Sequence, residues 1–404
     1  MLAIVAPSAQ AETSEGGAES RIGPVEWGLG ADTVGLGFAV QLRADVLSRD
    51  VGDRRSEELS LSIGRLRTTL RGGFFDDRFQ FEFQANTTPA TFELVDVWMS
   101  FAFDPSLQLR VGQMIVPYTW YRQISFSALS LVDWAPTTEW FGSERQFGLM
   151  LHDEAADDSP LSYRVGVFSG ENRRTSHAIR LRQFYGEPIR NLSAATDGGP
   201  TREVDPELVG TVRWSSPGFD GDAQTDFAGG PIRWSLAVSS AANLDADDAE
   251  DFVARGAIEG WLKVRHLSVL AIGYLGLANE TQGDDLIVAA GGVNVEAAYR
   301  LGRAFEIAGR FALVIPTEAL VNDARTRARD IIDGAGSPEE RDALVLQYEN
   351  AGDTTREQEA RLGLTYFVVG HSLKFQADAA WIQRELRGGT RDDVQARALL
   401  QLTF

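Results

Sequence analysis

Arginine and acidic residues recur at alternate positions along many short stretches of this 404-residue chain. In Val34–Ser48, the side chains of Gln41, Arg43 and Asp45 share one face, and apolar residues alternate with them on the other. Successive side chains of a β-strand point to opposite faces, so this spacing predicts a strand with one polar and one apolar face. A guanidinium stays charged and hydrogen-bonds oxyanions, so arginines gathered on the polar faces of neighbouring strands would attract anions.

The alternation assigns more bases than acids to the polar faces, which we expect to point to one interior. The inward bases are Arg43, Arg65, Arg67, Arg71, Arg110, Arg164, Arg213, Arg233, Arg255, Lys263, Arg300, Arg310, Arg361, Lys374 and Arg397. The inward acids are Asp45, Glu82, Asp96, Glu259, Glu296, Glu306 and Asp378. The simplest explanation for any one arginine is that it pairs with a neighbouring carboxylate and stabilises the wall. The acids are too few for the whole set, so we expect a net-positive interior in a chain of formal net charge −20.

The segment Ile115–Glu144 is rich in aromatic residues and contains Arg122, Asp133 and Glu139. A segment this apolar is not left in solvent. It folds either against the inner wall, where it would narrow a pore, or against a neighbouring subunit, and we favour the first. The residues that we expect to line the pore and set its selectivity are Arg43, Arg67, Arg110, Arg122, Arg145, Arg213, Arg233, Arg310, Arg361, Asp96, Asp133 and Glu139.

Sixteen strands carry these side chains. The predicted strands are Val34–Ser48, Leu59–Phe74, Phe79–Asn86, Phe92–Phe103, Leu107–Met114, Arg145–His152, Leu161–Gly170, Leu208–Ser215, Ile232–Ala241, Phe252–Arg265, Leu267–Ala278, Ile287–Leu301, Phe305–Ile315, Glu359–Val369, Leu373–Leu386 and Val394–Phe404. The alternation shifts near Gly64, which suggests a β-bulge. An even number of antiparallel strands, with both chain ends on one side, is typical of single-chain bacterial transmembrane β-barrels.

The connections between the strands fall into two classes. One set is mostly short, as at Asp76-Asp77, and the other contains the long insertions Ile115–Glu144, Glu171–Asp205 and Pro316–Gln358. Short periplasmic turns and long outer loops are the asymmetry of an outer-membrane barrel. The barrel domain is therefore residues 34–404, with residues 115–144 as an inward-folded third outer loop and residues 316–358 as a seventh outer loop.

The seventh outer loop is the one region with a helical pattern. Thr317–Asp333 has helical spacing, and Ser337-Pro338-Glu339-Glu340 has the pattern of an N-cap, an N1 proline and a capping box that would open a second helix, Arg341–Glu349. We therefore expect this loop to be partly helical, which is compatible with a helical hairpin over the barrel mouth.

The two ends of the chain indicate its location. Val394–Phe404 alternates apolar and mostly polar residues up to a terminal aromatic residue, so it must pair with the first strand to avoid a bare sheet edge. Phe404 resembles the signal read by the outer-membrane barrel assembly machinery. Met1–Ala11 is an apolar run ending in a signal-peptidase pattern, so we expect cleavage before Glu12, a true start further upstream and a periplasmic segment over residues 12–33. The alternative is a frayed cytosolic terminus.

Composition excludes several other classes of protein. The acidic net charge of −20 disfavours nucleic acid as a partner, because phosphates would be repelled. No apolar run approaches the roughly 20 residues of a membrane-spanning helix. The chain has no cysteine, and no nucleotide-binding, metal-ligand or catalytic-nucleophile motif is present, so we expect no cofactor, no metal and no enzymatic activity. Asp220, Asp222 and Asp226 are better explained as a solvated turn than as calcium ligands.

Four segments of the chain carry a resemblance to a known family. They are RGGFFDDRFQFEFQ (Arg71–Gln84), FELVDVWMSFAF (Phe92–Phe103), LQLRVGQMIVPY (Leu107–Tyr118) and ERQFGLML (Glu144–Leu151). Within them, Asp96, Val111-Gly112-Gln113, Pro117, Arg145 and Gly148 match motifs of the phosphate-selective porin O and P family, which the chain therefore resembles. The resemblance implies a sixteen-stranded, trimeric diffusion channel with an inward-folded third loop. Met114, Ile115-Val116 and Tyr118 depart from the family pattern, and only two lysines are present.

The combined prediction is an all-β, sixteen-stranded antiparallel transmembrane β-barrel of the bacterial outer membrane. We expect a water-filled channel for passive diffusion of small hydrophilic solutes, with a preference for anions such as phosphate. Its partners would be outer-membrane lipid and lipopolysaccharide, two further copies of the chain in a homotrimer, and the assembly machinery. The alternatives are a structural or adhesive barrel with a closed lumen and, with less support, a barrel enzyme.

Overall fold

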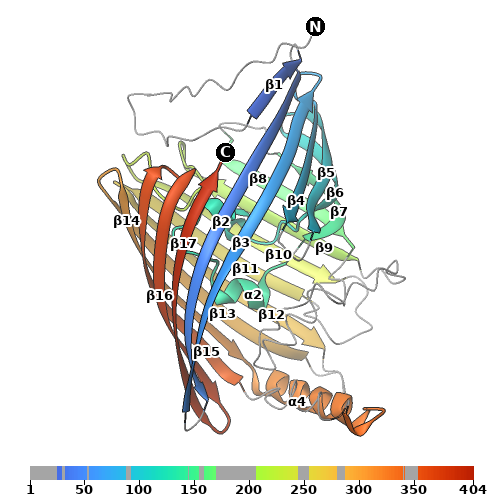
Figure 1. Cartoon of the computed structure of the whole chain (residues 1–404). Helices are drawn as coiled ribbons and strands as arrows, with labels where there is room; N and C mark the ends of the chain where they lie inside the picture. The colour runs from blue at the N-terminus through green and yellow to red at the C-terminus, as the bar shows by residue number, and fades with distance from the viewer. Residues whose placement is uncertain are drawn as a thin grey trace.

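Sixteen antiparallel strands, β2 to β17, form a closed barrel in the computed structural model (Figure 1). The model describes residues 25–29, 32–51, 54–87, 92–143, 145–153, 159–169, 206–243, 254–279, 287–339, 341 and 354–404. Each strand pairs with the next along the chain, and β17 pairs with β2 to close the ring. A short additional strand, β1, pairs with the first residues of β2.

The strands follow the chain in order. Their bounds are β1 (Val25–Leu29), β2 (Asp32–Val51), β3 (Arg54–Phe74), β4 (Phe79–Thr87), β5 (Phe92–Asp104), β6 (Leu107–Ile115), β7 (Arg145–His152), β8 (Leu161–Phe168), β9 (Glu207–Ser215), β10 (Arg233–Asn243), β11 (Ala254–Val264), β12 (Leu267–Asn279), β13 (Ile287–Leu301), β14 (Phe305–Pro316), β15 (Thr354–Val369), β16 (Leu373–Leu386) and β17 (Gly389–Thr403). All sixteen predicted strands are confirmed, and the largest differences are extensions of β3, β15 and β17 toward the loops before them.

The predicted β-bulge lies at Gly64. Gln41 of β2 is opposite Arg65 of β3, but the next residue, Leu42, is opposite Ile63. Gly64 is therefore the extra residue, and the side chains of β3 exchange faces there, as the shift in alternation predicted.

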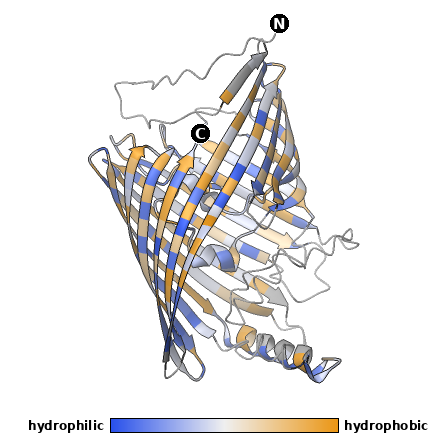
Figure 2. Ribbon diagram, viewed as in Figure 1, coloured by the Kyte–Doolittle hydropathy of each residue, from blue (hydrophilic) through white to orange (hydrophobic). Residues whose placement is uncertain are grey.

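The outer surface of the barrel is apolar, and the inner surface is polar. Large hydrophobic side chains such as Ile258 and Leu362 are 66% and 70% exposed on the outside. Figure 2 shows hydrophobic and hydrophilic residues alternating along the strands. On the outer face of a barrel that spans a bilayer, a basic residue at the midplane would cost about 2–4 kcal/mol, which accounts for an apolar outer surface and a polar interior.

The described helices are short, apart from one. They are α1 (Trp120–Gln123), the 3₁₀ turn η1 (Phe126–Ala128), α2 (Pro136–Phe141) and α4 (Glu318–Asp333). In Figure 1, α4 lies at the end of the barrel opposite β1 and the C-terminus, where the predicted helix over Thr317–Asp333 would place it. Among the described residues, no helix is long and apolar enough to cross a membrane.

Several predicted features lie outside the described residues. They are the signal peptide over residues 1–11, residues 12–24 of the N-terminal segment, the insertion Glu171–Asp205 and nearly all of the second predicted helix, Arg341–Glu349. Of the predicted periplasmic segment over residues 12–33, Val25–Leu29 forms strand β1.

Candidate functional site

The segment between β6 and β7, residues 116–143, lies inside the barrel and is called here the inner segment. Val116, Tyr118 and Phe141 are fully buried. α2 is visible within the barrel in Figure 1. The backbone and side chains of the inner segment contact inward-facing residues of β11 and of β13 to β17, which are distant in sequence. The segment therefore lies inside the lumen, with most of its hydrogen bonds to this part of the wall.

Buried carboxylates of the wall hold the first half of the inner segment. Glu259 of β11 accepts hydrogen bonds from the backbone N–H groups of Trp120 (2.7 Å) and Tyr121 (3.0 Å). The Tyr121 hydroxyl donates to Glu296 of β13 at 2.5 Å. The start of α1 is thus fixed by the two oxygens of the Glu259 carboxyl group, each of which accepts one of its backbone donors.

The two lysines of the chain bind backbone carbonyl groups of segments that fold inward. Lys374 of β16 is fully buried and donates to the carbonyl of Leu129 at 2.9 Å. Lys263 of β11 is also buried and donates to the carbonyls of Asp220 and Ala223, in the turn between β9 and β10. Each ammonium group offers several donors and can therefore hold chain that lacks strand partners.

The β9–β10 turn, residues 216–232, joins the inner segment. The backbone N–H of Gln224 donates to the carbonyl of Ala128 at 3.1 Å, and its side-chain oxygen accepts from Ser130 at 2.7 Å. Asp226 is 2% exposed and forms an ion pair with Arg233 at 2.7 Å. The expectation of a solvated turn is therefore wrong for Asp226, because the turn packs into the lumen instead of facing the bulk solvent.

Two ion-pair clusters, joined by a hydrogen bond from Arg310 to the backbone carbonyl of Asp133, form one network along the wall from β13 to β3. Its five guanidinium groups and five carboxylates balance, and they are Arg43, Arg65, Arg310, Arg361 and Arg397 with Asp45, Asp133, Glu296, Glu359 and Asp378. At its centre, Arg361 bridges Glu359 (2.8 Å) and Asp378 (2.5 Å), and Asp378 also accepts from Arg397 at 2.7 Å. The network carries no net charge, so each of these arginines is explained by its pairing with a nearby carboxylate.

Asp133 connects the network to the inner segment. Its carboxylate lies 3.1 Å from Arg43 and 3.5 Å from Arg65, and its backbone carbonyl accepts from Arg310 at 2.8 Å. Burial by itself would raise the pKa of Asp133, but the guanidinium groups of Arg65, Arg397 and Arg43 outweigh burial and hold the pKa at about 2. The carboxylate is thus ionised over the whole physiological range.

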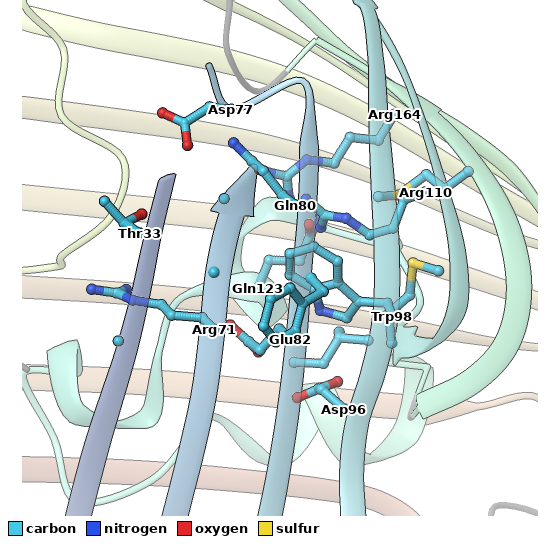
Figure 3. A pocket seen from close by; sticks show the side chains of 17 residues that line it. Thr33, Arg71, Asp77, Gln80, Glu82, Asp96, Trp98, Arg110, Gln123 and Arg164 are labelled. Carbon is cyan, nitrogen blue, oxygen red and sulfur yellow. The ribbon is translucent and has the colours of Figure 1, made fainter. Parts of the chain in front are cut away.

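The other side of the lumen, along β3 to β8, contains two adjoining cavities. The first has a volume of about 530 Å³ and is shown in Figure 3, and the second has a volume of about 610 Å³. Both are lined by Arg71, Glu82 and Gln123, so they share part of their wall. The second extends to Phe404 at the barrel end that holds the C-terminus. Together they form a path beside the inner segment.

Bases exceed acids along this path. Six arginines line the two cavities, against four carboxylates, and they are Arg67, Arg71, Arg110, Arg122, Arg145 and Arg164 against Asp77, Glu82, Asp96 and Asp222. Arg145 donates hydrogen bonds to both carboxylate oxygens of Asp96, at 3.0 and 2.9 Å. The net-positive character predicted for the whole lumen is therefore concentrated on this side.

Aromatic rings support many of these arginines. The guanidinium of Arg110 lies 3.9 Å from the ring centre of Trp98, and that of Arg67 lies 4.6 Å from Phe126. Arg122 lies 4.5 Å from the ring centre of Trp134. Stacking on a ring stabilises the cation and fixes the plane of its donors.

The structure divides the predicted pore-lining residues into three groups. Those that line the cavities are Arg67, Arg110, Arg122, Arg145 and Asp96. Those in the neutral network are Arg43, Arg310, Arg361 and Asp133. The others are Arg213, stacked on Trp120 at 3.9 Å, Arg233, paired with Asp226, and Glu139, which is exposed on α2.

Four relevant residues were missed by the sequence reasoning. Glu359 is the first residue of a predicted strand and alternates with Arg361, so its inward direction was readable. Glu207 lies one residue before a predicted strand and is paired with Arg255. Asp226 was assigned to a solvated turn. Trp98 shares a face with Asp96, and an inward tryptophan in a wet lumen was a usable signal.

Several solved structures have a similar fold. OprB of Pseudomonas putida is similar with a TM-score of 0.58 and 13% sequence identity, over 91% of this chain and 94% of OprB. The outer-membrane channel DcaP of Acinetobacter baumannii is similar with a TM-score of 0.56 and 11% identity, over 96% of this chain and 100% of DcaP. The anion-selective porin from Comamonas acidovorans gives 0.54 and 11%, over 92% of this chain and 100% of that porin.

By sequence, no protein-family model and no curated protein matches the chain. The resemblance to phosphate-selective porins therefore depends on the four motif segments alone. The structural likeness, at these identities, establishes the fold. A closed barrel with an apolar outer band and a polar lumen satisfies every backbone hydrogen bond within a bilayer. The chain is, by architecture, a bacterial outer-membrane β-barrel with the sixteen-stranded fold of the porins.

Proposed function

We propose that the protein is a passive diffusion channel for small hydrophilic solutes that prefers anions. The observation that carries the proposal is the pair of adjoining cavities beside the inner segment, lined by six arginines and four carboxylates. The inner segment reduces the open cross-section of the barrel, so it would limit solute size. It would also shield much of the neutral ion-pair network from a passing solute.

The physical basis for anion preference is local charge. The whole chain carries a net charge of −20, but the cavity lining has an excess of two positive charges. Charges within a narrow lumen act over distances shorter than the Debye length of about 8 Å at physiological ionic strength, so distant loop acids are largely screened there. A lining of this sign raises the local concentration of anions.

The direct test is the current through purified protein in a planar lipid bilayer. A water-filled channel gives discrete conductance steps, and anion preference gives a reversal potential of the anion-selective sign in a potassium chloride gradient. A folded protein that gives no current would support the closed-lumen alternative instead. A reversal potential of the cation-selective sign would show that the acidic loops dominate.

A charge reversal at Arg110 tests the route through the cavities. Arg110→Glu changes the lining by two unit charges, which at about 8 Å in water alters the energy of a passing anion by about 1 kcal/mol, or roughly fivefold in relative permeability. The matched control is Arg303→Glu, since Arg303 is exposed in the turn between β13 and β14. Equal effects of the two variants on the reversal potential would contradict the proposed route.

Selection of phosphate over other anions is the narrower expectation from the sequence within the same class. Both lysines of the chain are buried and hold backbone carbonyls, so phosphate selection would depend on arginine alone. Relative permeability to phosphate and chloride, measured in the same bilayers, tests this point.

We also propose the partners expected for such a channel. They are outer-membrane lipid and lipopolysaccharide around the apolar band, and two further copies of the chain in a homotrimer. The implied trimer has about three times the protein mass of one chain, which is 44.2 kDa. Light scattering of the detergent-solubilised protein, corrected for detergent, would reveal a monomer if the trimer proposal is wrong.

A further inference from the structure

We propose that the cavity of about 530 Å³ is a binding site for an organic acid, one carboxylate on an apolar body, within the solute path. The proposal rests on the channel function above and names the class of solute that the channel binds best. Figure 3 shows the side chains that line this cavity, which come mostly from β3 to β8, with Thr33 of β2, Asp77 of the β3–β4 turn and Gln123 of α1.

One part of the cavity wall suits a carboxylate. Arg71, Arg110 and Arg164 line it and come from three different strands, β3, β6 and β8. The guanidinium of Arg110 lies over the ring of Trp98 at 3.9 Å, and that of Arg164 lies over the ring of Trp120 at 4.0 Å. A ring behind the guanidinium leaves its donors in a fixed plane, which matches the planar, bidentate geometry of a carboxylate.

A second part of the wall is apolar and lies next to the first. Met114 and Met150 face the lumen and are each 3% exposed, and both line the cavity with Trp98. Met150 is directly opposite Arg110 in the pairing of β6 with β7. Thioether and indole groups contact aliphatic and aromatic carbon favourably. The site therefore presents cations and an apolar surface within a few residues of each other.

The acids of the cavity restrict the charge of the solute. Asp96 is neutralised by Arg145, which binds both of its oxygens. Glu82 is opposite Arg71 in the pairing of β3 with β4, and Asp77 lies in the turn between these strands, so two further carboxylates face the three arginines of the lining. A single carboxylate is compatible with that balance. Inorganic phosphate carries more charge, is strongly hydrated and gains nothing from Trp98, Met114 or Met150, so this cavity disfavours it relative to an organic acid.

The size of the cavity agrees with this class of solute. A volume of about 530 Å³ falls in the range of small-molecule sites, roughly 300–1,000 Å³. A benzoate-sized molecule fits with room for water, which a channel needs if the solute is to leave again.

The test is block of the chloride current in single-channel recordings by three added anions: benzoate, acetate and inorganic phosphate. We expect benzoate to occupy the path and interrupt the current at a concentration at least tenfold lower than acetate or phosphate. Acetate carries the same carboxylate without the apolar body, so it separates charge from apolar contact. Equal potency of the three anions, or a stronger block by phosphate, would overturn the proposal.

Two variants locate the block in this cavity. Trp98→Leu removes the ring and should weaken the block by benzoate at least fivefold, and the block by acetate much less, because acetate loses only the orientation of Arg110 and no apolar contact. Arg110→Lys keeps the charge and loses the planar donors, so anion selectivity should persist while the benzoate block weakens. Trp381→Leu is the matched control, because Trp381 is exposed on the outer face of β16.

The outcomes separate this proposal from the channel function. A folded protein without current contradicts both. A chloride current that benzoate blocks no better than acetate keeps the channel and overturns the binding site. A benzoate block that survives unchanged in Trp98→Leu and Arg110→Lys also overturns the site, because the block then arises elsewhere.

Discussion

At the residue scale, the surroundings of a lumen arginine determine its role. Arg361 lies between Glu359 and Asp378, so its charge is neutralised and its side chain stabilises the barrel wall. Arg110 lies over Trp98, lines a cavity and contributes to the positive potential there. Alternation along the strands predicted that both side chains point inward. It did not predict which arginine is neutralised, because partners such as Asp378 for Arg361 come from a neighbouring strand.

The ionisation of Asp133 gives a pH prediction. Its pKa is about 2, below the ordinary value of 3.8, so the carboxylate holds its proton less readily in the folded channel than in the unfolded chain. The ionised Asp133 carboxylate therefore makes its full contribution to the free energy of unfolding above about pH 5. That contribution is lost as the pH falls toward about 2. We expect single-channel conductance and noise to stay constant from pH 7 to about pH 4 and to change below about pH 3.

The control for this prediction is Asp133→Asn, which cannot ionise. Its conductance and noise at pH 7 should resemble those of the unmodified channel at the lowest pH. A transition centred near pH 6 in the unmodified protein would show that another group controls the inner segment.

At the element scale, the inner segment and the β9–β10 turn act as one packed body inside the barrel. The turn contacts the segment through Gln224. Of the wall residues, Glu259 and Lys374 hold the segment and Lys263 holds the turn. The sequence indicated that the segment is too apolar for solvent. It gave no sign that the turn would join it, since Asp220, Asp222 and Asp226 have the composition of an exposed turn.

Glu259→Gln tests the anchoring of the inner segment. The charge is lost, and one of the backbone donors of Trp120 and Tyr121 is left without its acceptor. An unsatisfied buried donor costs about 1–3 kcal/mol. We expect the free energy of unfolding in lipid vesicles to fall by about that amount, and open-channel noise to increase.

The matched control for this variant is Glu93→Gln, because Glu93 is exposed near the start of β5. It makes the same chemical change without affecting the inner segment. Unchanged noise in Glu259→Gln, with a normal folded fraction, would show that the remaining contacts are sufficient to hold the segment.

At the scale of the whole molecule, closure of the barrel depends on the pairing of its first strand, β2, with its last, β17. Phe404 exchanges backbone hydrogen bonds with Phe38 at 2.7 and 2.9 Å, and their rings lie 5.4 Å apart. The predicted pairing of the last strand with the first is confirmed over ten residue pairs, from Val394 opposite Ser48 to Thr403 opposite Ala39. No sheet edge of the sixteen-stranded ring is left open.

Phe404→Ala separates two roles of the terminal residue. If the assembly machinery reads Phe404, the variant should accumulate at least severalfold less folded protein in the outer membrane, measured by heat-modifiable migration. Refolding from urea into detergent should then be nearly normal, because the backbone pairing survives.

A comparable loss in both settings would mean that Phe404 acts only through its packing on Phe38. The matched control is Phe103→Ala, because Phe103 is 63% exposed on the outer face near the end of β5. That variant should leave both measurements close to those of the unmodified protein.

The sequence by itself determined the barrel. Side-chain alternation has a period of two, so each strand reports its own inner and outer face, and sixteen such strands with short turns and long loops leave one architecture. The Gly64 bulge and the inward direction of most arginines follow from the same local rule.

The tertiary structure decided how the lumen is divided. Glu359 neutralises Arg310, Asp133 joins the inner segment to the wall, and Trp98 meets Arg110, all across strands or loops that local patterning does not relate. Such pairings depend on strand register and on the path of the inner segment through space. For that reason the net-positive interior expected for the whole lumen became a neutral wall on one side and a basic path on the other.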